Sequence, residues 1–341
     1  MNQDWLLVET LGEQPMVVAQ GRQMKNFVPL AVFLRRNPNL AAIQTAITET
    51  VATRTGLASL TPKTKRIIRT EPVQMSDGCI HGVQVWSGPT DADPPERPIP
   101  GPLKWDMTLG EGSVTAEYLV NAGMDPSKEA LTGRAFVEDI PSRSLNRDES
   151  KALSWAIDVE PGRVFCSTWD FPDKQGGFRR VGWCARTLVE TAENGKEHLV
   201  ARSMNLLETI RDSPADNGEL AHHIIDGLSQ PGSYRMIVDL DNWRALKWLD
   251  DPCPLVDWRN RQQMHPDDEY LRPQLTRELE NGSTSAVLRL SGHGDSWVPL
   301  HVTISRIALD NGTQAGLVTL REPTADELAK AGLEPAVEPG S

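Results

Sequence analysis

The sequence lacks any apolar run of the roughly 20 residues that a membrane-spanning helix needs. Near its amino end it carries Asp4, where a secretory signal would carry positive charge. We therefore expect a cytoplasmic protein without a membrane span. Cysteines are scarce and form no Cys-x-x-Cys pair, so we expect reduced, structural thiols. The four cysteines are Cys79, Cys166, Cys184 and Cys253.

The sequence also contains fewer basic than acidic residues. Lys and Arg number 35 against 47 Asp and Glu, which gives a formal net charge of −12 at pH 7. A domain that binds duplex nucleic acid gains affinity from clustered Lys and Arg that neutralise phosphates. Here the basic residues are scattered along the chain, so the sequence predicts no nucleic-acid partner. The acidic balance is compatible with a basic protein partner.

Familiar catalytic motifs are missing, including Gly-x-Ser-x-Gly, His-Glu-x-x-His, the phosphate-binding loop and Gly-x-Gly-x-x-Gly. We predict no catalytic residue, no metal and no cofactor. One segment, His265-Pro266-Asp267-Asp268, offers an imidazole and two carboxylates, which suit metal binding or acid–base chemistry. Carboxylates in a first turn also suit the start of a helix, which we favour. A hydrolase-like site at His265 with Asp267 or Asp268 is the alternative.

Prolines mark the clearest boundary, because six of them fall between Pro89 and Pro102. Proline fixes φ and donates no hydrogen bond, so this run predicts an extended linker and no central strand. We predict a first module at 1–90, a linker at 91–102, modules at 103–212 and 213–325, and a flexible tail at 326–341.

The first module shows strand candidates around one helix. An apolar stripe at helical spacing predicts a helix between Pro38 and Gly56. Turn residues separate two pairs of strand candidates, which predicts two hairpins and hence an antiparallel sheet. The strand candidates are Trp5–Thr10, Met16–Gln20, Arg66–Met75 and Cys79–Trp86.

The rest of the chain contains an internal repeat. Each copy is a three-stranded meander, and helix candidates at 148–157 and 267–279 precede the two copies, with Pro273 expected to shorten the second helix. The predicted strands are 164–169, 179–189 and 198–206 in the first copy, and 286–290, 297–308 and 315–321 in the second. The sequence therefore predicts an α+β protein of three modules, each an antiparallel sheet flanked by short helices.

This order of elements resembles a PAS domain, and it does so twice. In the second copy the resemblance covers the first strand, the His-Pro-x-Asp turn that opens a helix, the Gly-x-x-Trp hairpin and the closing strand. Those segments are Met236–Asp241, His265–Asp268, Gly294–Val298 and Gly316–Leu320. The first copy is divergent, with Ile140-Pro141-Ser142-Arg143 in place of His-Pro-x-Asp. The first module resembles the related GAF fold.

The whole chain resembles a mycobacterial and actinobacterial family of GAF–PAS–PAS proteins. The segments that carry this resemblance are Asp4–Gly12, Gly101–Asp106, Cys166–Asp170 and Lys247–Pro254. It implies a sensor-only architecture with no attached kinase, cyclase or DNA-binding output, and a role as a signal-integrating scaffold. It implies no known ligand. We expect protein partners of unknown identity and leave a small-molecule ligand open. A purely structural interaction module is a further alternative.

Tryptophan is over-represented, with ten residues against three tyrosines. Large apolar rings with one N–H can line a small-molecule pocket, although ordinary core filling is the alternative that we favour. The candidate pocket residues are Trp105, Trp155, Trp169, Trp183, Trp243 and Trp297. Cys166 and Cys184, on meander strands, are possible redox-sensing thiols, but nothing nearby in sequence lowers a thiol pKa, so we favour buried packing.

Overall fold

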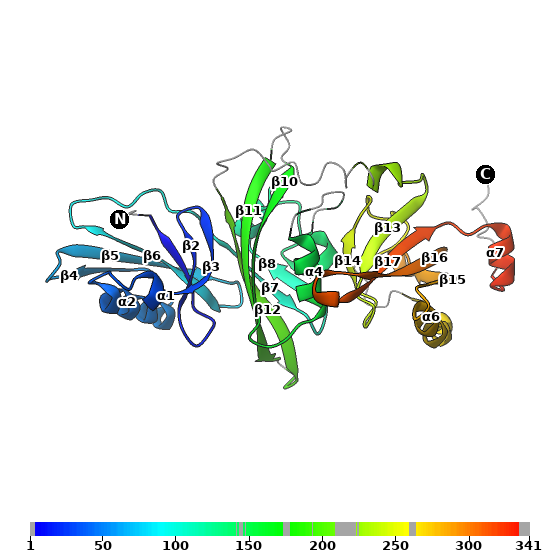
Figure 1. Ribbon diagram of the computed structural model, residues 1–341, viewed down its shortest axis with the longest axis horizontal. Helices are drawn as coiled ribbons and strands as arrows, with labels where there is room; N and C mark the ends of the chain where they lie inside the picture. The colour runs from blue at the N-terminus through cyan, green and yellow to red at the C-terminus, as the bar shows by residue number, and fades with distance from the viewer. Residues whose placement is uncertain are drawn as a thin grey trace. The chain divides into compact units, whose positions relative to one another are not determined.

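The computed structural model in Figure 1 confirms the predicted fold class, because it holds three antiparallel sheets flanked by short helices. It describes residues 4–140, 142, 146, 148–172, 178–192, 194–208, 223, 225–258 and 264–333. The chain divides into two compact units. The first comprises Met1–Arg134 and Val159–Ala215, and the second comprises Ala135–Asp158 and Asp216–Ser341. The predicted boundary at residues 212 and 213 lies outside the described residues.

The amino-terminal sheet has six strands in the order β3-β2-β1-β6-β5-β4. Both predicted hairpins are confirmed, since β1 pairs with β2 and β5 pairs with β6. Helices α1 and α2 cover one face of the sheet (Figure 1), and Ile43 and Ile47 of α2 are buried against it. The elements are β1 (Leu6–Glu9), β2 (Met16–Gln20), β3 (Gln23–Pro29), α1 (Leu30–Phe33), α2 (Leu40–Thr53), β4 (Leu57–Thr61), β5 (Arg66–Gln74) and β6 (Ile80–Pro89).

The middle sheet also has six strands, in the order β10-β11-β12-β7-β8-β9. The first predicted meander is confirmed as β10, β11 and β12, which pair in sequence. Helix α3 begins after Thr115, whose hydroxyl accepts a hydrogen bond from the Tyr118 amide. The elements are β7 (Gly101–Asp106), β8 (Glu111–Val114), α3 (Ala116–Asn121), β9 (Thr132–Ala135), β10 (Val164–Pro172), β11 (Phe178–Thr191) and β12 (Glu197–Leu207).

The proline run differs from its prediction at its carboxyl end. Strand β7 begins at Gly101, and Pro102 lies opposite Met204 in the middle of the sheet. The expectation of no central strand before residue 103 is therefore wrong for these two positions. Proline lacks a donor but keeps its acceptor, and the Pro102 carbonyl accepts hydrogen bonds from the amide and the hydroxyl of Thr115.

The carboxyl-terminal sheet has five strands in the order β14-β13-β17-β16-β15, and its last three strands confirm the second predicted meander. On β16 the residues Leu300, Val302 and Ile304 are buried on one face, as the alternating pattern predicts. The predicted helix at 267–279 is divided, since a 3-10 helix η2 precedes α6 and Pro273 lies in the first turn of α6. The elements are β13 (Ser233–Val238), β14 (Ala245–Trp248), η2 (Pro266–Leu271), α6 (Arg272–Leu279), β15 (Ser283–Ser291), β16 (Trp297–Ala308) and β17 (Gln314–Arg321).

Helix α4 (Glu149–Ile157) forms as predicted and belongs to the second unit, whereas the meander that follows it in sequence belongs to the first. The buried Lys247 ammonium of β14 lies 2.7 Å from the Glu149 carboxylate. The Ser154 hydroxyl donates to the carbonyl of Asp310, whose amide donates in turn to the Ser150 hydroxyl. Helix α4 is thereby built into the carboxyl-terminal unit.

The predicted tail is only partly described. Its first residues form α7 (Ala325–Lys330), which Thr324 caps and which Arg321 holds through an ion pair with Glu327. The expectation of a flexible segment from residue 326 is therefore wrong for 326–330, and residues 334–341 lie outside the described part. Among the helices of the described residues, none has the length and apolar character needed to cross a membrane.

Candidate functional site

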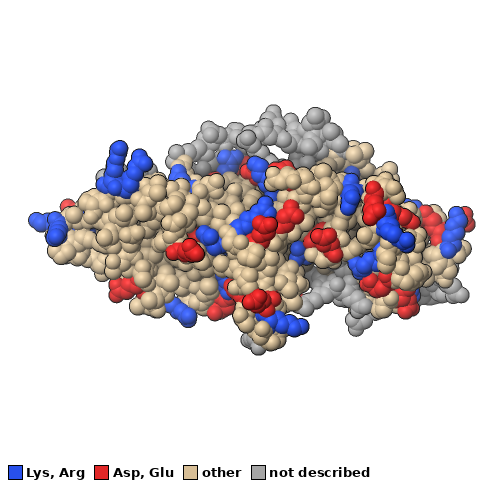
Figure 2. Space-filling model, turned by 60° about the horizontal axis from the view of Figure 1, so that its bottom comes forward, with Lys and Arg blue, Asp and Glu red and all other residues tan. Residues whose placement is uncertain are grey.

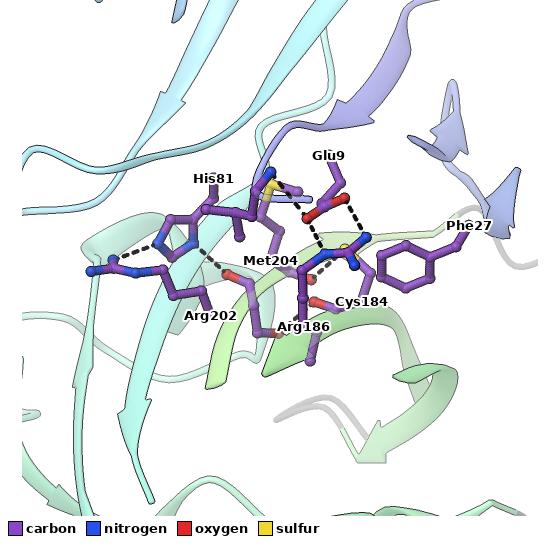
Figure 3. Close-up of a pocket in the computed structure, with 10 residues that line it drawn as sticks. Glu9, Phe27, His81, Cys184, Arg186, Arg202 and Met204 are labelled. Carbon is purple, nitrogen blue, oxygen red and sulfur yellow. Dashed lines mark hydrogen bonds and ion pairs between the residues drawn. The ribbon is translucent and has the colours of Figure 1, made fainter. Parts of the chain in front are cut away.

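A polar cluster of the first unit lies where the amino-terminal sheet meets the middle sheet (Figure 3). We call this contact the joint and define it by Glu9, Asp77, His81, Arg186 and Arg202. The first three residues come from the amino-terminal sheet and its β5–β6 turn, whereas the two arginines come from β11 and β12. The side chains around it line a small pocket that has no room for a water molecule.

One half of the joint is a buried, two-pronged ion pair. Glu9 is 2% exposed at its side chain, and its carboxylate accepts hydrogen bonds from Arg186 Nε at 2.7 Å and from the terminal nitrogen Nη2 at 2.9 Å. The Arg186 guanidinium also lies 5.6 Å from the ring centroid of Phe27 (Figure 3). Parallel hydrogen bonds fix direction as well as distance. This pair therefore sets the position of β1 against β11.

The other half of the joint is centred on Arg202, whose side chain is 5% exposed. Its guanidinium donates to the Asp77 carboxylate at 2.7 Å and to Glu190, which Lys104 also contacts at 2.7 Å. Burial opposes the ionisation of Asp77 and Glu190, but hydrogen bonds from Arg202 hold the pKa of both carboxyls below the usual range. Asp77, Glu190 and Arg202 are therefore charged at neutral pH.

His81 completes the joint and is fully buried. Its Nε2 lies 3.0 Å from a terminal nitrogen of Arg202, and its Nδ1 lies 3.0 Å from the carbonyl oxygen of Ser203 (Figure 3). A guanidinium can only donate, so Nε2 accepts and the protonated Nδ1 donates to the carbonyl. Burial lowers the pKa of His81 to about 4. The imidazole is therefore neutral at neutral pH and acts as a fixed link between the two sheets.

The candidate tryptophans are not gathered in one place. Among the six, Trp169 and Trp183 pack together, with ring centroids 5.3 Å apart, and Tyr118 meets Trp183 edge-on at 5.8 Å. The indole N–H groups of Trp169 and Trp183 are buried and have no acceptor within the described part of the chain. Trp105 and Trp155 are each buried elsewhere. Burial of Trp105, Trp155 and Trp169 fits core filling, and the pocket assignment of the six tryptophans stays a prediction.

The two remaining candidate tryptophans lie beside polar groups of the second unit. The Arg272 guanidinium lies over the Trp243 ring at 5.4 Å from its centroid. Trp297 meets the ring of His265 edge-on, with the centroids 4.8 Å apart.

The His265 segment is the start of a helix, as we favoured. His265 is the residue before η2, and its Nδ1 accepts a hydrogen bond from the Asp267 amide at 3.1 Å. Asp268 is held by Arg289, with the Arg289 amide 2.8 Å from its carboxylate. Within the described ranges, no three His, Cys, Asp or Glu side chains are grouped so that they could hold a metal ion.

The surface charges are consistent with the scattered pattern of the sequence. On the face that Figure 2 shows, Lys and Arg side chains are interspersed with Asp and Glu and do not gather into one basic patch.

Sequence reasoning missed the joint, although each member leaves a signal in the sequence. Glu9 directly follows the apolar residues Leu6 to Val8, and His81 and Arg202 interrupt strands that are otherwise almost wholly buried. Charged or titratable side chains in such strands need partners when they are buried. The partners could not be named, because they come from a different sheet far away in sequence.

Three domain models of one family match the chain in order. They are the Rv3651-like amino-terminal domain at residues 4–96, the middle domain at 99–208 and the carboxyl-terminal domain at 218–331. A search of curated proteins finds no match.

A crystal structure of an uncharacterized protein from Mycobacterium tuberculosis is 52% identical in sequence. It aligns over 98% of this chain and 100% of that chain with a TM-score of 0.89. Two sensor structures align weakly. A sensory box histidine kinase/response regulator from Burkholderia thailandensis E264 has 11% identity and a TM-score of 0.22 over 38% of this chain and 86% of that chain. An RNA-binding light-oxygen-voltage receptor has 10% identity and a TM-score of 0.25 over 65% and 95%.

Proposed function

Because the chain belongs to the Rv3651-like family and matches its three domains in order, we propose that it is a sensor or scaffold that integrates small-molecule or protein signals. In this proposal the first module is GAF-like and the next two are PAS-like. The protein acts by changing which partner its modules bind, without a catalytic output domain of its own.

The observation that carries the proposal is the joint. Arg202 of the middle sheet is held between Glu190 of its own sheet and Asp77 of the amino-terminal module, with buried His81 against its other side. Separating a buried ion pair costs about 3–5 kcal/mol. A ligand or partner that displaces β6 must therefore either move β12 with it or break the contacts of Arg202, at the free-energy cost just given. Such coupling is what signal integration requires.

The placement of α4 supports the same proposal for the other two modules. The family match assigns residues 99–208 to the middle domain, yet residues 135–158 pack within the second compact unit. The Lys247–Glu149 pair places a buried charge contact between α4 and β14. The middle domain thus supplies part of the carboxyl-terminal core, so the two domains cannot respond as independent bodies.

The experiment starts from the full chain purified from an actinobacterial host. Native mass spectrometry and pull-down identify a retained ligand or partner, which is then added back to purified protein while hydrogen exchange is measured. We expect slower exchange in strands of at least two modules. In Arg202→Met, binding to the amino-terminal module should no longer slow exchange in β12.

Three outcomes would contradict the proposal. Exchange that changes in one module only would refute integration. The failure to find any ligand or partner would favour a purely structural module. Turnover in a broad activity screen that His265→Ala abolishes would favour the hydrolase-like alternative.

A further inference from the structure

Two cysteines face each other across neighbouring strands of the middle sheet. Cys166 of β10 and Cys184 of β11 are direct partners in the antiparallel register. Directly opposite residues point to the same face of a sheet, with Cβ atoms about 4.5–5.5 Å apart. Their Cα atoms lie about 4.5–5.5 Å apart in either kind of antiparallel pair, which is within the range that disulfides span. A disulfide has its Cβ atoms about 3.5–4.5 Å apart, so bonding the sulfurs requires both side chains to turn toward each other and the two strands to close slightly.

A third sulfur lies in the same row, because Met204 of β12 is the direct partner of Cys184. This face packs against the amino-terminal sheet through a cluster that also holds Phe27 and Met24. The Cys166 Sγ lies 3.5 Å from the Lys25 carbonyl oxygen of β3, and the Cys184 Sγ lies 3.6 Å from the Met204 carbonyl oxygen. The two thiols therefore lie beside the joint.

The two thiols differ in access to solvent. Cys184 is 1% exposed, and burial raises the pKa of its thiol. Cys166 is half-buried and lies on β10, which is an edge strand of the sheet. A small oxidant therefore reaches Cys166 first, whereas Cys184 can react only with a neighbour. This is the usual division between a reacting and a resolving cysteine.

We propose that Cys166 and Cys184 form an oxidisable dithiol, a modification site that hydrogen peroxide converts into a cross-strand disulfide. Peroxide oxidises the Cys166 thiol to a sulfenic acid and is reduced to one water. The Cys184 sulfur then attacks the Cys166 sulfur, the S–S bond forms, the S–O bond breaks, and the hydroxyl leaves as a second water with the Cys184 proton. Two electrons and two protons of the dithiol thus reduce one peroxide to two waters, and an added dithiol reverses the change.

Oxidation has a structural consequence at the contact between the two sheets. The disulfide has no S–H, so the carbonyls of Lys25 and Met204 lose their thiol donors. Lys25 belongs to β3 of the amino-terminal sheet, and we therefore expect faster hydrogen exchange in β3 after oxidation. The inference rests on the register of β10 and β11 and does not depend on the proposed function.

The test treats the full chain with hydrogen peroxide, blocks remaining thiols with N-ethylmaleimide and maps peptides by mass spectrometry. We expect a loss of about two daltons, a linked peptide pair containing Cys166 and Cys184, and full recovery with dithiothreitol. Cys79 is half-buried like Cys166 and serves as the internal control, which should stay alkylated.

Single variants separate the two roles. Cys166→Ser should abolish the mass loss, whereas Cys184→Ser should leave a sulfenic acid on Cys166 that dimedone traps. If a serine variant does not fold, Cys184→Ala replaces it, and the wild-type peptide map alone decides the main point. Oxidation of Cys79 at the same rate, or over-oxidation of Cys166 without a linked peptide, would overturn the proposal.

Discussion

Acidification should weaken the joint through His81. The imidazole has an ordinary pKa of 6.5, and burial lowers the pKa to about 4 in the folded protein. Between these values the unfolded chain binds a proton that the folded protein excludes, so stability is complete above pH 6.5 and falls as the pH drops toward 4. From pH 7 to pH 5 the loss amounts to about 2 kcal/mol.

The charged neighbours of His81 do not mimic this effect. Hydrogen bonds from Arg202 hold the pKa of Asp77 and Glu190 below the usual range, and the pKa of Arg202 is raised by the same pairs despite its burial. All three therefore keep their charge between pH 5 and pH 7, while the proton uptake of unfolded His81 changes across that interval.

The assay compares wild type with His81→Asn in urea unfolding at pH 7 and pH 5. Asparagine retains a donor near the position of Nδ1 but does not titrate. Between pH 7 and pH 5 the stability of the His81→Asn variant should therefore fall by about 2 kcal/mol less than the stability of wild type. His223→Asn serves as the matched control, because the side chain of His223 is exposed. A difference below about 0.5 kcal/mol between wild type and His81→Asn would refute the assignment of a neutral, buried imidazole.

Three other substitutions probe the packing. Arg202→Met should lower the free energy of unfolding by about 3 kcal/mol, which is the low end for a buried ion pair because Glu190 keeps its contact with Lys104. Arg69 is exposed, so Arg69→Met should change the free energy of unfolding in urea by less than about 0.5 kcal/mol. Equal effects of the two substitutions would contradict the burial of the Arg202 pair. Gly82→Ala should lower the free energy of unfolding by about 1–3 kcal/mol, because the added Cβ would come within 2.6 Å of a β1 carbonyl oxygen. Gly227→Ala is the control, since a Cβ at that position meets open space. If thermal unfolding shows no effect of Gly82→Ala, the two strands can separate to admit the methyl group. Lys247→Met should destabilise the second unit by about 3–5 kcal/mol, because the Glu149 carboxylate of α4 loses the Lys247 ammonium. A loss of less than about 1 kcal/mol in calorimetry would contradict burial of the pair.

Local patterns predicted the elements well. Turn residues between Gln74 and Ile80, and alternation along β16, depend on neighbours in sequence, so hairpins and meanders could be predicted.

Contacts between distant segments could not be predicted. The joint pairs Glu9 with Arg186 and His81 with Arg202, and nothing near either residue identifies its partner. Likewise, the apolar face of α4 shows that the helix is buried but not which sheet buries it. The tryptophans could not be assigned to a pocket or to a core from the sequence, because a bulky ring fills a core and lines a pocket equally well.

Hydrogen exchange of Arg202→Met against wild type tests the central claim most directly, because that claim is the coupling of two sheets through one buried cation. The account predicts faster exchange in β5 and β6 as well as in β11 and β12, since Asp77 and His81 lose the same partner as Glu190. Faster exchange confined to β11 and β12, with β5 and β6 as protected as in wild type, would contradict it.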